Sequence, residues 1–321
     1  MNKKRLLVTG SAGFIFSNFI RQCVYDKHPY ELYSVDRITN SSMMNNIYQH
    51  RLHEFFIADI CDRHIMDKIF EYVKPEIVVH GAAEAAVDAS IVSADNFIKS
   101  NVLGTQIMVD LSIKYGVEKF VQISTDEVYG ALSADDKPWT EGSPINPLNP
   151  YSASKASAEL IVKAAGNTHK LPFIITRSCN NYGARQTSDK LIPRSIKCIL
   201  NGEKIPVYGN GKQMREWVHV YDNCNAILKI ISDGKIGETY NISTGDELTN
   251  IEVINNICNI MGEGKELINH IIPDPRPGHD FRYAIENNKV KSLGWAPVYK
   301  FKDGLNNTIN WYNSNKFYLK N

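Results

Sequence analysis

The fold of this chain is decided by a glycine-containing stretch near its start, VTGSAGFIF at residues 8–16. The stretch follows an apolar run at residues 5–9, which predicts a buried strand, and it opens a segment of helical character. A turn from a strand into a helix is the context of a dinucleotide-binding fingerprint. Gly10 would permit the tight turn, and Gly13 would let a pyrophosphate approach the backbone N–H groups at the helix N-terminus.

Two downstream carboxylates fit the same ligand. About twenty residues beyond the turn, Asp36 ends the second predicted strand, where it can accept a hydrogen bond from the adenine ribose. A negative charge there disfavours a 2′-phosphate, so we predict NAD rather than NADP, although the adjacent Arg37 argues the other way. Asp59 and Ile60 follow the third predicted strand and are placed to hold the adenine. Together these residues disfavour the alternative of a helix-opening turn without a ligand.

The first half of the chain alternates between strand-like and helix-like segments. Helix-length segments such as residues 62–73 and 93–115 separate apolar runs of strand length. These runs lie at residues 5–9, 31–35, 54–58, 77–80, 120–124 and 173–177. This alternation is typical of a parallel sheet covered by helices on both faces. The sequence therefore predicts an α/β protein with a Rossmann-like, doubly wound parallel sheet.

The alternation loosens after residue 177. Loops rich in proline, glycine and asparagine separate short strands from helical segments near residues 190–201, 221–233 and 250–261. We expect residues 178–321 to form a smaller, mixed α/β substrate-binding lobe over the carboxyl ends of the strands, where doubly wound folds bind ligands. Residues 1–177 would form the NAD-binding domain. The boundary is soft, because no linker marks it, and the chain can cross between the two parts.

The composition excludes several classes of function. Hydrophobic residues make up 43% of the chain and charged residues 22%, as in ordinary globular proteins. The formal net charge of +1 gives no reason to expect a nucleic-acid partner. No apolar run reaches the roughly 18 residues that a membrane span needs. The six cysteines are scattered without a CxxC pair, so we expect reduced thiols, a cytoplasmic location and no metal site.

One tyrosine–lysine pair stands in a context that suits acid–base chemistry. The spacing Tyr-x-x-x-Lys occurs four times, and three of these pairs are expected at the solvated surface. Tyr151 and Lys155 differ, because Pro150 precedes them and can start a helix that places both side chains on one face. They also follow the strand ending in Ser124, whose hydroxyl can join the hydrogen bonds of the phenol. A nearby ammonium would lower the pKa of Tyr151 and make it a general base.

Two adjacent carboxylates, Asp126 and Glu127, lie between that strand and the Tyr151 helix. Paired acids in different environments can take opposite protonation roles. Together with the tyrosine and the lysine, they provide more acid–base groups than alcohol oxidation needs. This surplus indicates a reaction that also breaks a C–H and a C–O bond. The alternative is that the two acids only cap the junction between strand and loop.

Seven short pieces of the chain carry a resemblance to a known family. They are VTGSAGFI (8–15), STDEVYG (124–130), NPYSASKASAE (149–159), TRSCNNYG (176–183), KLIP (190–193), PVYGNGKQMREWVHVYDN (206–223) and RPGHDFRYAI (276–285). With them the chain resembles, over nearly its full length, the extended short-chain dehydrogenase/reductases, and among these the nucleoside-diphosphate-glucose 4,6-dehydratases. STDEVYG is the most specific piece, because related epimerases typically lack the adjacent acid pair.

The resemblance implies a hydro-lyase that works in three steps. Tyr151, with Lys155 and Thr125 beside it, would remove the O4 proton of the sugar while NAD takes the hydride from C4. Glu127 would then remove the C5 proton, and protonated Asp126 would donate to the departing C6 hydroxyl. NADH would return the hydride to C6. The cofactor would therefore stay tightly bound and be regenerated in each turnover.

The resemblance also implies two sets of binding residues. Those for NAD are Gly10, Ala12, Gly13, Phe14, Ile15, Asp36, Arg37, Asp59, Ile60, Ala82, Ala83, Tyr151 and Lys155. Those for the sugar nucleotide, on UDP or dTDP, are Glu84, Ala85, Ala86, Asn181, Lys190, Leu191, Pro206, Val207, Tyr208, Arg215, Asn250, Arg276 and His279. Arg215 and Arg276 would clamp the diphosphate, since the arginine fork suits paired oxygens. For Lys190, Arg194 and His279 a solvated or structural role stays open.

Two departures from the family pattern bear on binding. Phe16 stands where relatives usually have a third glycine, which normally permits close packing of helix on strand. We expect NAD binding with a locally shifted helix. Ala85, Ala86 and Ala89 stand where glucose-type relatives carry larger polar residues, including a histidine. The space opened there favours UDP-linked 2-acetamido-glucose slightly over UDP-glucose and dTDP-glucose, unless a loop closes the gap.

Rival interpretations use the same scaffold. A C4 epimerase or a simple dehydrogenase would keep NAD and Tyr151 but make Glu127 dispensable. A non-catalytic, NAD-binding regulatory protein is disfavoured by the complete set of acid–base residues. Epimerisation at C5 during dehydration stays open. Relatives commonly dimerise through two helices, here residues 93–115 and 152–167, which implies a homodimer with a four-helix interface.

Overall fold

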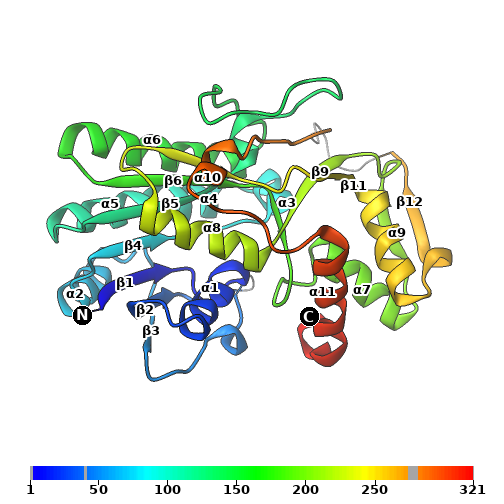
Figure 1. Cartoon of the computed structure of the whole chain (residues 1–321), viewed down its shortest axis with the longest axis horizontal. Coiled ribbons are helices and arrows are strands. Elements are labelled where there is room, and N and C mark those ends of the chain that lie inside the picture. Colours follow the sequence, from blue (N-terminus) through cyan, green and yellow to red (C-terminus); the bar gives the residue numbers. More distant parts are fainter. Residues whose placement is uncertain (1–2, 40–41, 274–280, 321) are drawn as a thin grey trace.

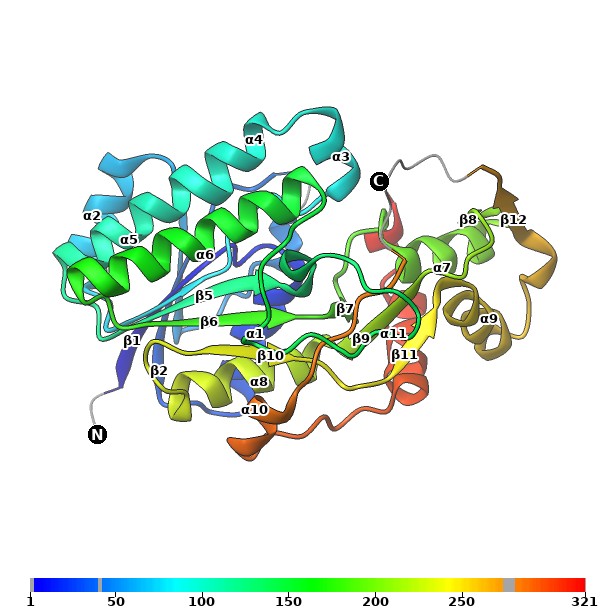
Figure 2. The same cartoon turned by 90° about the horizontal axis from the view of Figure 1, so that it is seen from above.

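A seven-stranded parallel sheet forms the centre of the molecule (Figures 1 and 2). The computed structural model describes residues 3–39, 42–273 and 281–320. The strands lie in the order β10-β6-β5-β4-β1-β2-β3, and every neighbouring pair is parallel. Their bounds are β1 Lys4–Thr9, β2 Tyr30–Asp36, β3 His53–Ile57, β4 Ile77–His80, β5 Lys119–Thr125, β6 Phe173–Ser178 and β10 Thr239–Ile242. The predicted fold class is confirmed.

Helices cover both faces of this sheet, as Figure 2 shows. One face carries α2 (Arg63–Val73), α5 (Gly104–Lys114) and α6 (Pro150–His169), and the other carries α1 (Phe14–Tyr25) and α8 (Val220–Asp233). The apolar run of β1 serves both faces, because successive strand side chains point to opposite sides. Leu6 and Val8 pack in the α1 and α8 layer, whereas Leu7 packs in the other layer. Burial on both faces explains why the run is apolar throughout.

The order of the strands places the ligand sites. The chain leaves β1 toward β2 on one side, and β4 lies on the other side of β1. The loops after β1 and β4 therefore separate at the carboxyl edge of the sheet, where doubly wound folds leave a crevice. Gly10 and Gly81 follow these two strands and lie against each other. A Cβ added at Gly10 would stand 2.8 Å from the Ala82 nitrogen, so this approach of two backbones requires glycine.

The long helix predicted at residues 93–115 is interrupted. Its described parts are α4 (Asp95–Phe97), a π-helical segment η2 (Ile98–Leu103) and α5, while α3 (Val87–Val92) is a separate short helix. Asn101 explains the irregular turn, because its amide is tied to the loop after β4. Its Nδ2 donates to the Glu84 carbonyl at 3.0 Å and to Ser154 Oγ at 2.8 Å, and its Oδ1 accepts from the Glu84 nitrogen. Single π turns are frequent near functional sites.

Helix α6 starts where the sequence predicts it. Asn149 is the N-cap, Pro150 is the first helical residue, and the side chains of Asn149 and Ser152 form a reciprocal capping box. Further along the helix, Glu159 pairs with Arg177 of β6 in the protein interior. Arg177 Nε and Nη2 donate to the two Glu159 oxygens at 2.9 and 2.5 Å. Both ends of the pair are buried, so it fixes the helix against the sheet.

A second lobe is built from two small sheets and their helices. The sheets are β11-β9-β7 and β12-β8. The bounds are β7 Asn180–Tyr182, β8 Ile205–Tyr208, β9 Met214–His219, β11 Glu247–Thr249, β12 Ile268–Ile271, α7 Leu191–Asn201, α9 Asn250–Met261 and α11 Phe301–Ser314. Between β9 and β11 the chain returns to the first part, where α8 and β10 complete the large sheet. The boundary after residue 177 stays a prediction.

The remaining elements are short. They are η1 Met44–Asn46, η3 Asp126–Tyr129, η4 Lys265–Leu267, α10 Asn288–Ser292 and η5 Lys316–Leu319. All six cysteines are free thiols, as the sequence predicts. Within the described ranges, no helix has the length and apolar character of a membrane span. The cytoplasmic location stays a prediction.

Candidate active site

The first of two adjoining cavities lies at the crevice above β1 and β4. It has a volume of about 260 Å³. Most residues predicted for NAD line it: Gly10, Gly13, Phe14, Ile15, Asp36, Arg37, Ile60, Ala82, Ala83, Tyr151 and Lys155. Ala12 and Asp59 stand behind this wall. The Ala12 nitrogen donates to Asp36 Oδ2 at 3.0 Å, and Asp59 pairs with Arg37 at 3.1 Å.

The residues of this cavity fit a dinucleotide. The backbone of Gly10 has φ +78°, which turns the chain sharply out of β1. Helix α1 then begins after Gly13, an N-cap without a side chain, so the first backbone N–H groups of the helix meet no capping side chain. Asp36 lies at the end of β2 with its carboxylate oriented by the nitrogens of Ala12 and Ile38. The uncapped N–H groups at the start of α1 suit a pyrophosphate, and the Asp36 carboxylate suits a ribose diol.

Arg37 is engaged by two acids. Its guanidinium donates to Asp59 and to Glu84. The arginine is therefore committed to carboxylates instead of being free for a 2′-phosphate, which removes the main objection to NAD. Glu84 was predicted to contact the substrate, but it lines the first cavity and forms this ion pair.

Phe16 is accommodated by a missing side chain on the neighbouring loop. Its ring is 4% exposed and packs against the backbone of Gly81. A Cβ added at Gly81 would lie only 2.0 Å from Phe16 Cε2. Both residues line the first cavity. The room that relatives make at the helix is thus made here at Gly81, and α1 still begins at Phe14.

The acid–base residues lie where the first cavity meets the second. Thr125 ends β5, Asp126 and Glu127 are the first two residues of η3, and Tyr151 lies on α6. Thr125 Oγ1 donates to Asp126 Oδ1 at 3.2 Å. Asn149 Nδ2 donates to Glu127 Oε2 at 3.2 Å, so the N-cap of α6 also orients this acid. Asn149 was missed in the sequence, although the Asn-Pro start of the helix was a usable signal.

The second cavity has a volume of about 870 Å³ and holds the predicted substrate residues. Those lining it are Ala85, Ala86, Asn181, Lys190, Leu191, Pro206, Val207, Tyr208, Arg215 and Asn250. Asp126, Glu127 and Tyr151 also line it, as does Ala89 of the alanine-rich loop. Arg276 and His279 lie outside the described residues. Residues that the sequence reasoning missed are Asn149, Ser178, Gln186, Asp189 and Tyr283.

Two polar side chains of the second cavity are positioned for a ligand. Arg215 is buried, with its guanidinium 4.5 Å from the centre of the Tyr283 ring and Nη1 bound to the Met214 carbonyl at 2.7 Å. Asn181 donates to the Cys179 carbonyl, while among the described residues its buried Oδ1 has no hydrogen-bond partner. Buried polar atoms are normally satisfied, so such an atom in a cavity marks a contact point.

Burial sets the protonation states at this centre. It raises the pKa of the Asp126 carboxyl well above its usual range, and Glu127 and Glu216 add to the rise. Burial therefore favours the protonated form of Asp126, which is the form that the acid of an elimination needs. Burial lowers the pKa of Lys155 to about 8, against an opposing effect of Glu159.

The expected effect of Lys155 on Tyr151 is wrong. Burial raises the pKa of the Tyr151 phenol, and Glu127 and Asp126 raise it further, because all three disfavour the phenolate. Lys155 Nζ instead donates to the Ile123 carbonyl at 2.6 Å. The partner of the phenol also differs, since the Thr125 side chain hydrogen-bonds it. Within the described chain the Ser124 hydroxyl has no hydrogen-bond partner.

Comparison with known proteins identifies the family. The sequence profile of the GDP-mannose 4,6 dehydratase family matches residues 7–308. The chain belongs to this family. One similar protein is the low-salt glycan biosynthesis protein Agl12 of Haloferax volcanii, which is 43% identical over 96% of this chain and 98% of its own length. A dTDP-glucose 4,6-dehydratase of Streptomyces niveus is 40% identical over 97% of this chain and 94% of its own length.

Solved structures agree with the family. DesIV of Streptomyces venezuelae, a dTDP-glucose 4,6-dehydratase crystallised with NAD bound, matches this dehydratase with a TM-score of 0.93. The two are 38% identical, and the match covers 98% of this chain and 99% of that chain. The prediction of an NAD-dependent nucleotide-sugar 4,6-dehydratase of the extended short-chain type is thereby confirmed.

Proposed function

We propose that this dehydratase converts dTDP-glucose to its 4-keto-6-deoxy product. The observation that carries the proposal is the position of Tyr151, which lines both cavities. Lys155 lies on the cofactor side, and Asp126 and Glu127 lie on the substrate side. Acid–base groups for oxidation and for elimination therefore flank one point between the cofactor and the sugar.

Each proton transfer of the proposed reaction can then be assigned to one residue. NAD, when bound, would supply the hydride acceptor for C4, the hydride donor for C6 and a positively charged ring. Tyr151 takes the O4 proton, helped by its hydrogen bond with Thr125. Glu127, oriented by Asn149, takes the C5 proton that the new ketone has made acidic. Asp126, which burial keeps protonated, donates to the C6 hydroxyl as water leaves.

The division of roles is tested with Glu127→Gln. We expect formation of the alkali-absorbing 4-keto-6-deoxy product to fall by about 10²–10⁴-fold, the usual worth of a positioned general base. Oxidation at C4 does not need Glu127, so enzyme-bound NADH should accumulate in a single turnover. Glu118→Gln, a surface acid paired with Lys4, is the matched control. Full product formation by Glu127→Gln would contradict the assigned role.

The choice of sugar nucleotide is the finer question. The relatives described above that are named for a substrate are named for dTDP-glucose, which gives no support to the predicted preference for UDP-linked 2-acetamido-glucose. One observation keeps that sugar as a second candidate, since Ala85, Ala86 and Ala89 do line the substrate cavity. Parallel kcat/KM measurements on dTDP-glucose, UDP-glucose and UDP-2-acetamido-glucose decide between them. Turnover of the acetamido sugar alone would overturn the proposal. The NMR spectrum of the product reports the C5 configuration.

We also propose that the enzyme is a homodimer. Helices α5 and α6 pack side by side on one face of the molecule (Figure 2). Large apolar side chains on this face are half exposed, among them Ile98, Leu103 and Leu160. Burying such a group between two copies is favourable. Light scattering on the purified protein should give twice the chain mass of 36.3 kDa, and a single-chain mass would refute the dimer.

A further inference from the structure

The C-terminal segment of the second lobe contacts the NAD-binding part. Tyr318, in the short helix η5, is buried at 3% exposure. Its hydroxyl donates to Asn46 Oδ1 at 2.9 Å, and Asn46 is 2% exposed. A second contact joins the same hydroxyl to the Asn45 carbonyl at 3.3 Å. The two residues are 272 positions apart in sequence, so only the fold brings them together.

Asn46 also binds the glycine turn. Its Nδ2 donates to the Ala12 carbonyl at 2.9 Å, and the Met43 nitrogen donates to the same carbonyl at 3.1 Å. The nitrogen of Ala12 is held by Asp36. Ala12 is thus fixed through both its N–H and its carbonyl, directly between Gly10 and Gly13, which line the cofactor cavity.

The amide of Asn46 can serve both partners in one orientation only. Its oxygen accepts from Tyr318, and its nitrogen donates to Ala12. Without the Tyr318 hydroxyl, the buried amide oxygen loses its donor and the orientation is no longer enforced. Tyr318 therefore bears, through Asn46, on the geometry of the glycine turn.

Further hydrogen bonds connect helix α1 to Asn46 and to the second lobe. Arg21 of α1 donates to the Asn46 carbonyl at 2.7 Å. From the second lobe, Arg185 donates to Asn18 of α1 at 3.2 Å while it lies over the Trp311 ring. Helix α1, which starts at the glycine turn, is therefore bound to the second lobe through Asn18.

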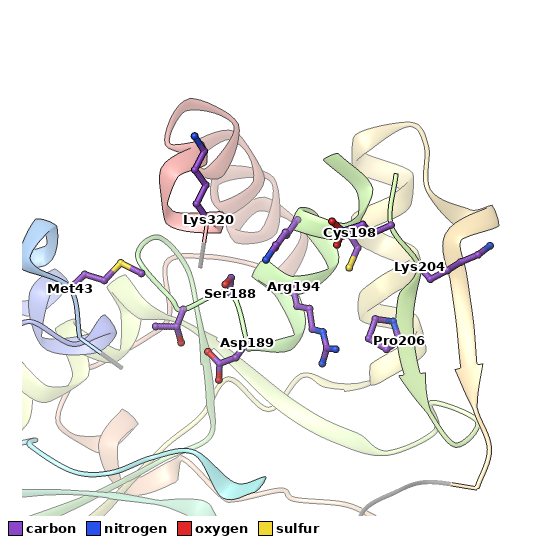
Figure 3. A pocket seen from close by; sticks show the side chains of 11 residues that line it. Met43, Ser188, Asp189, Arg194, Cys198, Lys204, Pro206 and Lys320 are labelled. Atoms are coloured by element: carbon purple, nitrogen blue, oxygen red, sulfur yellow. The ribbon is translucent and has the colours of Figure 1, made fainter. Parts of the chain in front are cut away.

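A cavity of about 840 Å³ adjoins this junction and shows how the parts meet. Figure 3 shows Met43, from the turn that binds Ala12, on one side of it and Arg194 and Pro206 of the second lobe on the other. Lys320 also lines it, two residues beyond Tyr318. Residues near Tyr318 thus lie between the cofactor-binding turn and the second lobe.

We propose that the C-terminal segment clamps the bound cofactor: Tyr318 acts through Asn46 on the Ala12 carbonyl and slows the dissociation of NAD. Tyr318, Asn46 and Ala12 are the C-terminal clamp. Opening of the glycine turn requires the Ala12 hydrogen bonds to break, and the clamp opposes that opening. A cofactor that must stay in place as NADH between two hydride transfers benefits from slow release. Tyr318 is a positioning residue, since it reaches the cofactor site through other groups. The inference needs NAD binding and is independent of the sugar.

The test is the rate of cofactor release from Tyr318→Phe in the full chain. The enzyme is loaded with NADH, and the loss of its bound fluorescence is followed after addition of excess NAD. We expect release about five- to tenfold faster than from the wild type, the factor for loss of one net hydrogen bond. Tyr240→Phe is the matched control. Its phenol is equally buried and accepts from the Lys235 nitrogen at 2.9 Å, away from the cavity.

Thermal unfolding separates the clamp from a general loss of stability. Both tyrosine variants should lower the midpoint by similar amounts, and only Tyr318→Phe should speed NADH release. Asn46→Asp provides a second probe, because it keeps an acceptor for Tyr318 but replaces the donor to Ala12 with a charged oxygen. It should release NADH at least as fast, and adding Tyr318→Phe should change the rate less than twofold. Wild-type release by Tyr318→Phe, or equal acceleration by Tyr240→Phe, would overturn the clamp.

Discussion

Adding one methyl group at Gly81 tests the packing beneath the cofactor. In Gly81→Ala the new Cβ would lie 2.0, 2.5 and 2.7 Å from Phe16 Cε2, Cδ2 and Cζ. Carbon atoms pack at about 3.5–4.0 Å, so Cε2 of the ring must move by roughly 1.5–2 Å. The ring is buried, and the Phe19 ring packs against it at a tilt of 58°, with 5.7 Å between the centroids. Gly81 has no positive φ, so the backbone itself tolerates alanine.

The size of the effect follows from these contacts. Overpacking a core costs about 1–3 kcal/mol, and so close an approach places Gly81→Ala in the upper part of that range. Phe16→Ala alone should cost about 3–5 kcal/mol, through lost burial and a cavity. With alanine at both positions the new methyl group enters the space that the ring has left. We therefore expect Gly81→Ala to cost little in the Phe16→Ala background, a coupling of about 2 kcal/mol.

The assay is urea denaturation of the four proteins of this cycle. Gly142→Ala is the control, because a Cβ there meets only Thr140 Oγ1, at 3.9 Å. Phe16 and Gly81 both line the cofactor cavity, so NAD affinity should fall with stability in Gly81→Ala. The reasoning fails if Gly81→Ala unfolds at the same urea concentration as Gly142→Ala. It fails equally if the cost of Gly81→Ala is unchanged when Phe16 is already alanine.

Two further predictions concern buried charges. Arg177→Met removes both hydrogen bonds of the buried Glu159 carboxylate and leaves it only the longer 3.8 Å ion pair with Lys163, which should cost about 3–5 kcal/mol of unfolding free energy; adding Glu159→Leu should recover most of it, and no recovery would contradict the pairing. Lys155 has its pKa lowered to about 8 by burial, so the folded protein releases this proton before the unfolded chain does. The stability of the wild type relative to Lys155→Met should therefore rise from pH 8 to about 10.4, and a flat difference would be the contrary result.

Local patterns predicted most of the fold. The six strands expected in the first half all appear, because buried parallel strands need continuous apolar runs and leave them plainly in the sequence. Helix α6 was predicted from Pro150 for an equally local reason, since capping involves neighbours in the chain. The helix expected at residues 93–115 was wrong at its start, because Asn101 bonds to the distant Glu84 and Ser154.

The sequence predicted which acid–base residues form the site, but not the direction in which the pKa of Tyr151 is shifted. Spacing and motif brought Asp126, Glu127 and Tyr151 together, and the structure has them on one cavity. The pKa of Tyr151 could not be read from its spacing to Lys155. The pKa of the phenol is raised by burial, and Lys155 donates to the Ile123 carbonyl instead of to the phenol. Both facts are properties of the packed protein.

The sequence by itself determined the sheet, the glycine turn and the order of the acid–base residues, because each depends on groups close together in the chain. Only the tertiary structure decided how Phe16 is housed, since its room comes from Gly81, and why Arg37 does not oppose NAD, since Asp59 and Glu84 neutralise it. It alone brought Tyr318 to Asn46. Such pairings join distant segments, and which segments meet is fixed only when burial of the core selects one arrangement of the whole chain.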